Sequence, residues 1–139
     1  MKEHVFRLHR GCDLYESIRS YCLEHHIQAG YVAACVGCVT KATIRSADGA
    51  TIHTLEERLE IVSLTGTISE KRCHLHISFS REDLSVVGGH LMPGCRINTT
   101  AEVVLCELDA FSFGKVFDPE TGYNELEIRP FPLNADHMT

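Results

Sequence analysis

The sequence predicts an α+β domain built on a largely antiparallel β-sheet. One stretch with helical periodicity lies near the N-terminus, and the rest of the chain alternates β-type runs with short turns. With 139 residues, of which 44% are hydrophobic, the chain suits one domain with a sizeable core. No internal repeat or linker divides it. We expect the core over about residues 5–116 and a C-terminal tail over about 118–139.

The N-terminal part predicts a short extended segment over residues 5–9 and then a helix. Asp13 is the expected N-cap, and Glu16, three residues later, completes the pattern of a capping box. The helix is expected to end near residue 25 or 26. Its apolar residues recur at helical spacing and predict one buried face. They are Leu14, Ile18, Tyr21 and Cys22.

The remaining elements are predicted as strands. Residues 31–36 form a continuous apolar run, which predicts a central strand covered on both faces, and Gly37 predicts a bulge or a close backbone approach. Asp48-Gly49 is a hairpin signal before a return strand. The segment 127–139 is expected to be extended or disordered. The strands expected beyond residue 50 cover residues 51–55, 59–68, 73–80, 86–91, 98–108 and 110–116.

Charge and hydropathy exclude several classes of protein. The net charge is −6, from 13 basic and 19 acidic residues. An acidic domain is poorly suited to non-specific duplex binding, which depends on neutralising phosphates. No run approaches the ~20 apolar residues of a membrane helix, and the first residues lack the apolar segment of a signal peptide. We therefore expect no membrane association and a cytoplasmic location.

The seven cysteines are an odd number and stand mostly among apolar residues. In a reducing compartment this favours small core residues over a disulfide framework. Cys35 and Cys38 form a C-x-x-C pattern, but it lies inside a predicted strand, whereas a redox pair normally begins a helix. No second pair completes a zinc ribbon. The role of this pair stays open.

Three histidines predict a metal site. His74 and His76 lie two residues apart in a predicted strand, and Gly88-Gly89 precede His90. Alternate side chains share a strand face, at a backbone spacing of about 6.6 Å for a rise of about 3.3 Å per residue, so both rings can lean toward one ion. Zinc accepts neutral imidazole, and three protein ligands leave one position open. The alternative is a pair of surface histidines.

Five motifs follow one another along the chain. They are Leu-Glu-Ile-Val-Ser-Leu-Thr-Gly-Thr-Ile at 59–68, His-Leu-His-Ile-Ser-Phe at 74–79, Val-Gly-Gly-His-Leu at 87–91, Pro-Gly-Cys at 93–95 and Thr-Thr-Ala-Glu-Val at 99–103. In this order they resemble the PPC (plants and prokaryotes conserved) domain family over about residues 5–115. The resemblance implies a mixed, mostly antiparallel sheet with flanking helices, assembled as a homotrimer. It also implies a metal on His74, His76 and His90, as in some prokaryotic members.

The family also implies a link to DNA. Plant members carry an AT-hook and bind AT-rich DNA, and stand-alone prokaryotic members are often labelled predicted DNA-binding. This sequence has no Arg-Gly-Arg-Pro hook and no basic arm before Val5 to enter a minor groove. We therefore expect that the DNA-binding function given to the family is only weakly implied for this chain.

Three functions follow as alternatives. The first is a trimeric protein with zinc or another divalent metal and a regulatory or small-ligand-binding role. The second is a metal-dependent enzyme that uses zinc-bound water, with Glu102 as the candidate base or as a partner of a ligand; Glu102 is otherwise a sheet-face carboxylate. The third is direct DNA binding, which the net charge disfavours. The sequence indicates no substrate.

Overall fold

The structure is a computed structural model that describes residues 1–131. It contains a single helix and nine strands within these residues, and no helix there is long and apolar enough to cross a membrane. The elements are β1 (Lys2–His9), α1 (Leu14–Glu24), β2 (Gly30–Arg45), β3 (Ile52–Leu55), β4 (Leu59–Ile68), β5 (Cys73–Ser80), β6 (Val86–Leu91), β7 (Arg96–Glu107), β8 (Phe111–Asp118) and β9 (Tyr123–Pro130).

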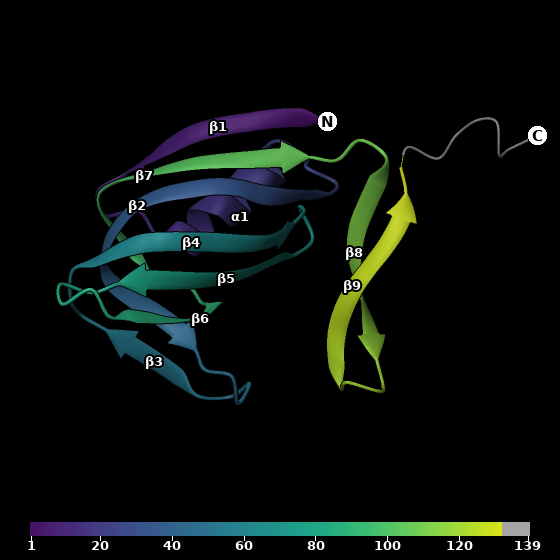
Figure 1. Ribbon diagram of the computed structural model, residues 1–139. Coiled ribbons are helices and arrows are strands. Elements are labelled where there is room, and N and C mark those ends of the chain that lie inside the picture. The colour runs from purple at the N-terminus through teal and green to yellow at the C-terminus, as the bar shows by residue number, and fades with distance from the viewer. Residues whose placement is uncertain (132–139) are drawn as a thin grey trace, which may run out of the picture.

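Seven strands form one curled sheet in the order β1-β7-β2-β4-β5-β6, with β3 paired to β2 (Figure 1). β6 also pairs with the last residues of β2, through Ile44 opposite Leu91 and Arg45 opposite His90. The sheet therefore folds back on itself at this end. The α+β class and the mostly antiparallel sheet are confirmed. A parallel pair, which the mixed sheet of the family implies, does not occur among residues 1–131.

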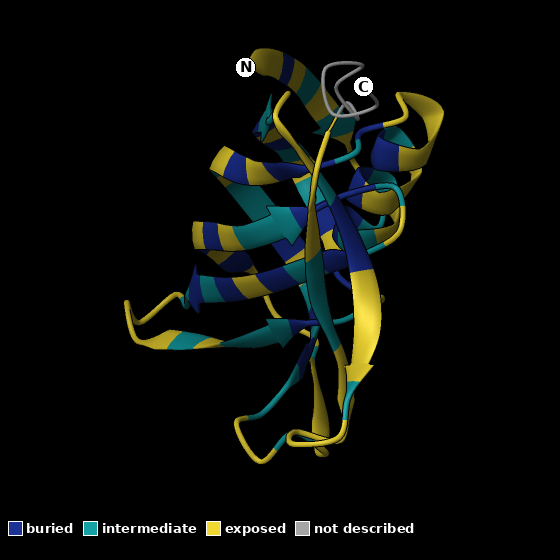
Figure 2. Cartoon of the chain, turned by 90° about the vertical axis from the view of Figure 1, so that its right-hand side faces the viewer, coloured by how far each residue is buried: buried dark blue, intermediate teal, exposed yellow. Residues whose placement is uncertain are grey.

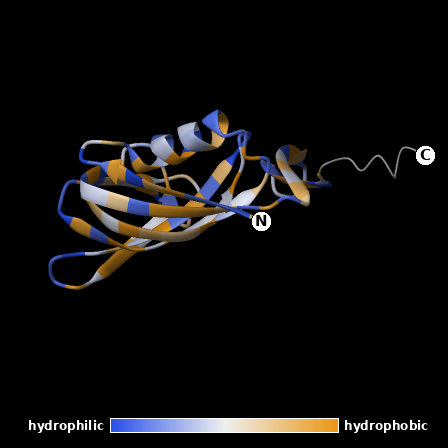
Figure 3. Ribbon diagram, turned by 90° about the horizontal axis from the view of Figure 1, so that it is seen from above, coloured by the Kyte–Doolittle hydropathy of each residue, from blue (hydrophilic) through white to orange (hydrophobic). Residues whose placement is uncertain are grey.

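Helix α1 packs along one side of the sheet, which is clear when the molecule is seen from above (Figure 3). Asp13 is the N-cap, as predicted, and its Oδ1 accepts the backbone N–H of Glu16 at 2.9 Å. Its Oδ2 accepts the N–H of Gly94 at 2.6 Å, which ties the helix start to the turn before β7. The buried face of the helix consists of Leu14, Ile18 and Cys22.

The core lies between this helix and the concave face of the sheet. Figure 2 shows buried and exposed bands alternating along the strands. In β5 the residues alternate strictly, with Leu75, Ile77 and Phe79 buried and both histidines on the other face. β7 contributes in the same way over residues 101–105, where every second residue is buried. β4 does so only at its start, because its pairing with β5 shifts register between Ile61 and Ser63. The buried residues of the two strands are Leu59, Ile61, Leu64, Ile68, Ile97, Ala101, Val103 and Leu105.

The prediction that residues 31–36 are covered on both faces is wrong for the single chain. Tyr31 and Val36 are exposed, the latter at 56%, because the convex face of the sheet has no second layer among the described residues. Gly37 lies at an irregularity in the β2–β7 pairing, and a Cβ there would collide with the carbonyl of Thr100. The expected close approach at Gly37 is therefore present, and the shift in register places the extra residues, Thr99 and Thr100, in β7 rather than in β2.

The C-terminal strands form a separate hairpin beside the main sheet (Figure 1). β8 was predicted over residues 110–116, whereas β9 was not predicted as a strand at all. Residues 119–122 form the turn between the two strands, and β9 lies in the segment predicted as the C-terminal tail. The hairpin is tied to the helix end of the domain by the N–H of Phe113, which donates to the carbonyl of Gln28 at 2.8 Å. The predicted tail beyond residue 131 lies outside the described residues.

Candidate metal centre

The three predicted histidines come together at the curled end of the sheet. His74 and His76 project from β5, and His90 in β6 lies directly opposite His76 in the antiparallel register. Their ring centroids are 5.1 Å apart for His74 and His76, 5.2 Å for His74 and His90, and 5.6 Å for His76 and His90. One nitrogen from each ring can be chosen so that all three lie within 4.8 Å of one another.

The local sequence explains this arrangement. The strict alternation of β5 sends the apolar residues inward and both histidines outward. Gly89, next to His90, lets β6 approach the end of β2 closely, since a Cβ at this position would lie 2.6 Å from the carbonyl oxygen of Arg45. The glycine therefore allows the third histidine to reach the other two.

Two arginines flank the histidines, and the sequence reasoning did not identify either of them. Arg45 at the end of β2 lies directly opposite His90. Arg72, just before β5, places its Nη2 3.3 Å from Nδ1 of His74. Arg72 precedes His74 by two residues, so the period of two in a strand indicates that both side chains lie on the same face. Arg45 had no such signal, because only the pairing of β2 with β6 brings it to the site.

The surroundings favour neutral imidazoles. Burial lowers the pKa of His90 to about 4, and the positive charge of Arg45 acts in the same direction. The pKa of His74 is also lowered, first by burial and then by Arg72. Neutral imidazole is the form that binds a metal ion. Nδ1 of His90 is buried and has no hydrogen-bond partner in the described part of the chain.

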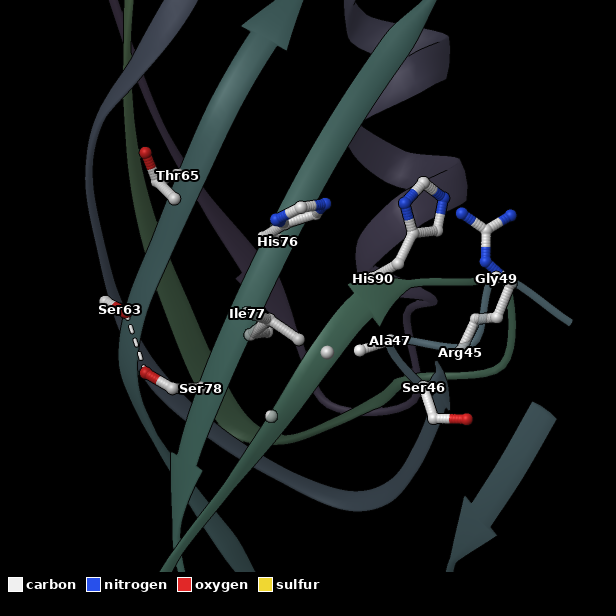
Figure 4. Close-up of a pocket in the computed structure, with 12 residues that line it drawn as sticks. Arg45, Ser46, Ala47, Gly49, Ser63, Thr65, His76, Ile77, Ser78 and His90 are labelled. Atoms are coloured by element: carbon white, nitrogen blue, oxygen red, sulfur yellow. Dashed lines mark hydrogen bonds between the residues drawn. The ribbon is translucent and has the colours of Figure 1, made fainter. Parts of the chain in front are cut away.

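Two open clefts meet at the histidines. The first, of about 600 Å³, lies over β4, β5 and β6, and Figure 4 shows His76, His90 and the guanidinium of Arg45 along it. The second, of about 580 Å³, lies toward the hairpin and adds Tyr123, Asn124 and Glu125 from β9. The polar side chains of the first cleft include the hydroxyls of Ser46, Ser63, Thr65 and Ser78.

Glu102 lies elsewhere in the chain. It is exposed on β7, opposite Arg7 of β1 and Val36 of β2, and β2 and β4 lie between β7 and β5. It lines neither of the two clefts at the histidines. A single chain therefore does not bring Glu102 to the histidine cluster.

The C-x-x-C pair lies within β2, as the sequence predicted, and all seven cysteines are free thiols. Burial raises the pKa of the Cys35 thiol to about 11, which disfavours the reactive thiolate. Sγ of Cys38 lies 3.2 Å from the carbonyl oxygen of Asn98 and donates to it. Neither thiol belongs to the histidine cluster.

A curled antiparallel sheet with one packed helix and three clustered histidines defines a small α+β domain with a candidate metal centre. The comparison with family models then places the chain: residues 1–109 match the model of the Plants and Prokaryotes Conserved (PCC) domain. The chain belongs to this family, also written PPC, as the motifs indicated. The match ends before β8, so the hairpin lies outside it.

Solved structures show the same fold. A hypothetical protein from Salmonella enterica is 31% identical, with a TM-score of 0.91 and 94% of each chain covered. A protein of Archaeoglobus fulgidus, described as metal-containing, is 30% identical, with a TM-score of 0.79 over 91% of this chain and 94% of that one. A Bacteroides thetaiotaomicron protein, provisionally described as DNA-binding, is 25% identical, with a TM-score of 0.80 over 90% and 91%.

Among curated proteins, the chain is similar to a protein from Synechococcus sp. named bifunctional protein GlmU. The two are 41% identical over 130 residues, which is 94% of this chain. The chain spans only about a fifth of that relative's length, since the match covers 21% of it.

Proposed function

We propose that this chain is a homotrimeric PCC-domain protein that binds one zinc or other divalent metal ion on His74, His76 and His90, and that its role is regulatory or the binding of a small ligand. The observation that carries the proposal is the set of three imidazole nitrogens within 4.8 Å of one another. The unpartnered Nδ1 of His90 fits a metal ligand as well. The metal-containing Archaeoglobus fulgidus protein supports the same assignment.

The donor set suits zinc. Three neutral imidazoles leave a fourth position open, and a metal at such a site supplies a Lewis acid or a bound water. The chain's own residues bind and orient the ion: the strand alternation fixes His74 and His76, and the β5–β6 pairing fixes His90. The alternative of an enzyme with Glu102 as base requires Glu102 to come from another chain, because its own strand is remote from β5.

Elemental analysis of protein purified without an affinity tag tests the metal site. We expect about one metal ion per chain in the parent and its loss in His90→Ala. His9→Ala is the matched control, because His9 is exposed on β1, away from the cluster. Equal metal content in the parent and in His90→Ala contradicts the assignment.

The homotrimer is supported by apolar side chains on the convex face of the sheet. Val5 of β1 is 71% exposed, and Val36 of β2 and Val62 of β4 are each 56% exposed. Exposed apolar side chains on one face of a sheet favour an interface with another chain. Light scattering is expected to give three times the chain mass, and a monomer mass at micromolar concentration contradicts the proposal.

Direct DNA binding is the second candidate, because the similar Bacteroides thetaiotaomicron protein carries that provisional description. The charge opposes it. A chain of −6 gives about −18 in a trimer, and each phosphate contact requires an arginine or lysine that faces the duplex. We expect weak binding that is lost with modest salt. Titration of AT-rich and GC-rich duplexes tests this, and a Kd well below about 10⁻⁶ M at physiological salt restores the DNA-binding function.

A further inference from the structure

A row of polar side chains crosses four strands at the candidate metal centre. Arg45 of β2 lies opposite His90 of β6, His90 lies opposite His76 of β5, and His76 lies opposite Thr65 of β4. Directly opposite residues in antiparallel strands share one face of the sheet. Arg45 is therefore the next neighbour of the histidines along the row, on the same face, and not a side chain from a separate surface.

Within the part of the chain that the structure describes, the cations beside the histidines have no acidic partner. Within residues 1–131, no carboxylate oxygen lies within 4.0 Å of a side-chain nitrogen of Arg45 or Arg72. Nε of Arg45 is buried and makes no hydrogen bond to any described residue. Arg72 has only Nδ1 of His74 as a side-chain partner, at 3.3 Å. Buried donors without acceptors are rare, because each one loses its hydrogen bonds to water.

The two clefts are also lined by few acidic side chains among the described residues. Among the described residues, the first cleft is lined by Arg45, several hydroxyls and two histidines, and by no acidic residue. The second contains two acidic residues. Asp48 is committed to its own turn, where it accepts the N–H groups of Ala50 and Thr51. Of the residues that the structure describes, Glu125 is then the only carboxylate of this cleft outside the turn, beside two arginines.

A divalent metal on three neutral imidazoles brings two further positive charges to this place, and no carboxylate ligand neutralises them. An excess of positive charge in a half-buried cleft attracts an anion. We propose that the cleft beside the histidines binds a small oxyanion, a carboxylate or phosphate group, with Arg45 as its principal partner and Arg72 as the second cation. This inference rests on the proposed metal site and names the class of ligand for it.

The charges also predict how the two ligands influence each other. The metal and the anion attract each other, so each increases the affinity of the other by the same factor. Arg45 attracts the anion but repels the metal. Replacing it with glutamine therefore weakens anion binding and does not weaken metal binding in the absence of an anion. A variant that is merely misfolded loses both.

The experiment uses the full chain loaded with cobalt(II), whose visible spectrum reports changes at the metal. Inorganic phosphate and acetate are titrated separately, with glycerol as the neutral probe. We expect a spectral change with at least one of the two anions, and a Kd that rises about tenfold or more in Arg45→Gln, within the usual range of such couplings. Arg10→Gln, in the exposed turn after β1, is the control and is expected to behave as the parent.

A second measurement is zinc affinity by competition with a chelator, with and without the effective anion. We expect the anion to tighten zinc binding about tenfold in the parent and to have little effect in Arg45→Gln. If only phosphate or only acetate produces a response, that result shows whether the cleft binds a phosphate or a carboxylate group. If the metal binds but neither anion changes the spectrum or the zinc affinity, this inference is wrong and the metal site stands. If the parent binds no metal, both proposals fail.

Discussion

The substitution Gly89→Ala tests whether the close approach of β6 to β2 is needed to hold the histidine cluster together. In Gly89→Ala the new Cβ lies 2.6 Å from the carbonyl oxygen of Arg45, about 0.8 Å closer than the 3.4 Å at which ordinary contacts begin. The obstacle is backbone, so it cannot rotate away. The β2–β6 pairing consists of only Ile44 with Leu91 and Arg45 with His90, whereas β5 holds β6 through five pairs. The short contact with β2 is therefore expected to open.

The cost follows from this geometry. Overpacking that shifts backbone costs about 1–3 kcal/mol, and we expect the free energy of unfolding in urea to fall by that amount. We also expect zinc affinity to fall about tenfold or more, since the contact next to His90 is lost. Gly114→Ala is the matched control, because its Cβ meets side chains and no backbone: Oε1 of Glu127 at 3.3 Å and Cδ of Lys71 at 3.8 Å. Parental stability and parental zinc affinity in Gly89→Ala would refute this account of the site.

Three further predictions concern the rest of the fold. Asp13→Ala removes the acceptor for Glu16 and Gly94 and should lower the free energy of unfolding by about 1–2 kcal/mol in urea titration, whereas Asp13→Asn should lose less. The pKa of Asp48 is lowered, first by the hydroxyl and N–H of Thr51, so its contribution to stability is present above its unfolded pKa near 3.8 and is lost as the pH falls below that value. Asp48→Ala should therefore reduce the loss of stability between neutral and acidic pH. An unchanged dependence of stability on pH in this variant rules the prediction out. Because the pKa of Cys35 is raised to about 11, alkylation at pH 8 should label Cys35 in the native protein far more slowly than in the urea-unfolded chain, as mass spectrometry of the labelled peptides can show.

The strands that lie between clear turn segments were predictable from the sequence. The predicted bounds 59–68, 73–80 and 86–91 match β4, β5 and β6, because the flanking turn residues define the ends of these strands. Alternation of apolar and polar residues also defines the buried face of β5. β9 was missed. Its sequence, Tyr-Asn-Glu-Leu-Glu-Ile-Arg-Pro, is rich in charged residues and ends in proline, and it is a strand because β8 pairs with it.

Long-range neighbours were the harder part. The histidines were predictable, since two share a strand face and the third follows glycines. The exposed convex face of β2 was not predictable, because a continuous apolar run does not reveal which face another element covers. Arg45 was missed for a related reason. It lies 45 residues before His90, and only the closure of the sheet makes them neighbours.

The hairpin gives the site a component that the family match does not contain. The match ends at residue 109, yet Glu125 of β9 lines the second cleft, and its charge raises the pKa of His74 against the larger effect of burial. Glu125 thus attracts the metal and repels an anion, opposite to Arg45. We expect Glu125→Gln to weaken zinc binding several-fold and to tighten phosphate or acetate binding on the cobalt-loaded protein by a similar factor. Glu120→Gln, exposed in the hairpin turn, is the control. If Glu125→Gln moves both affinities in the same direction, the hairpin acts on the site through its shape and not through its charge.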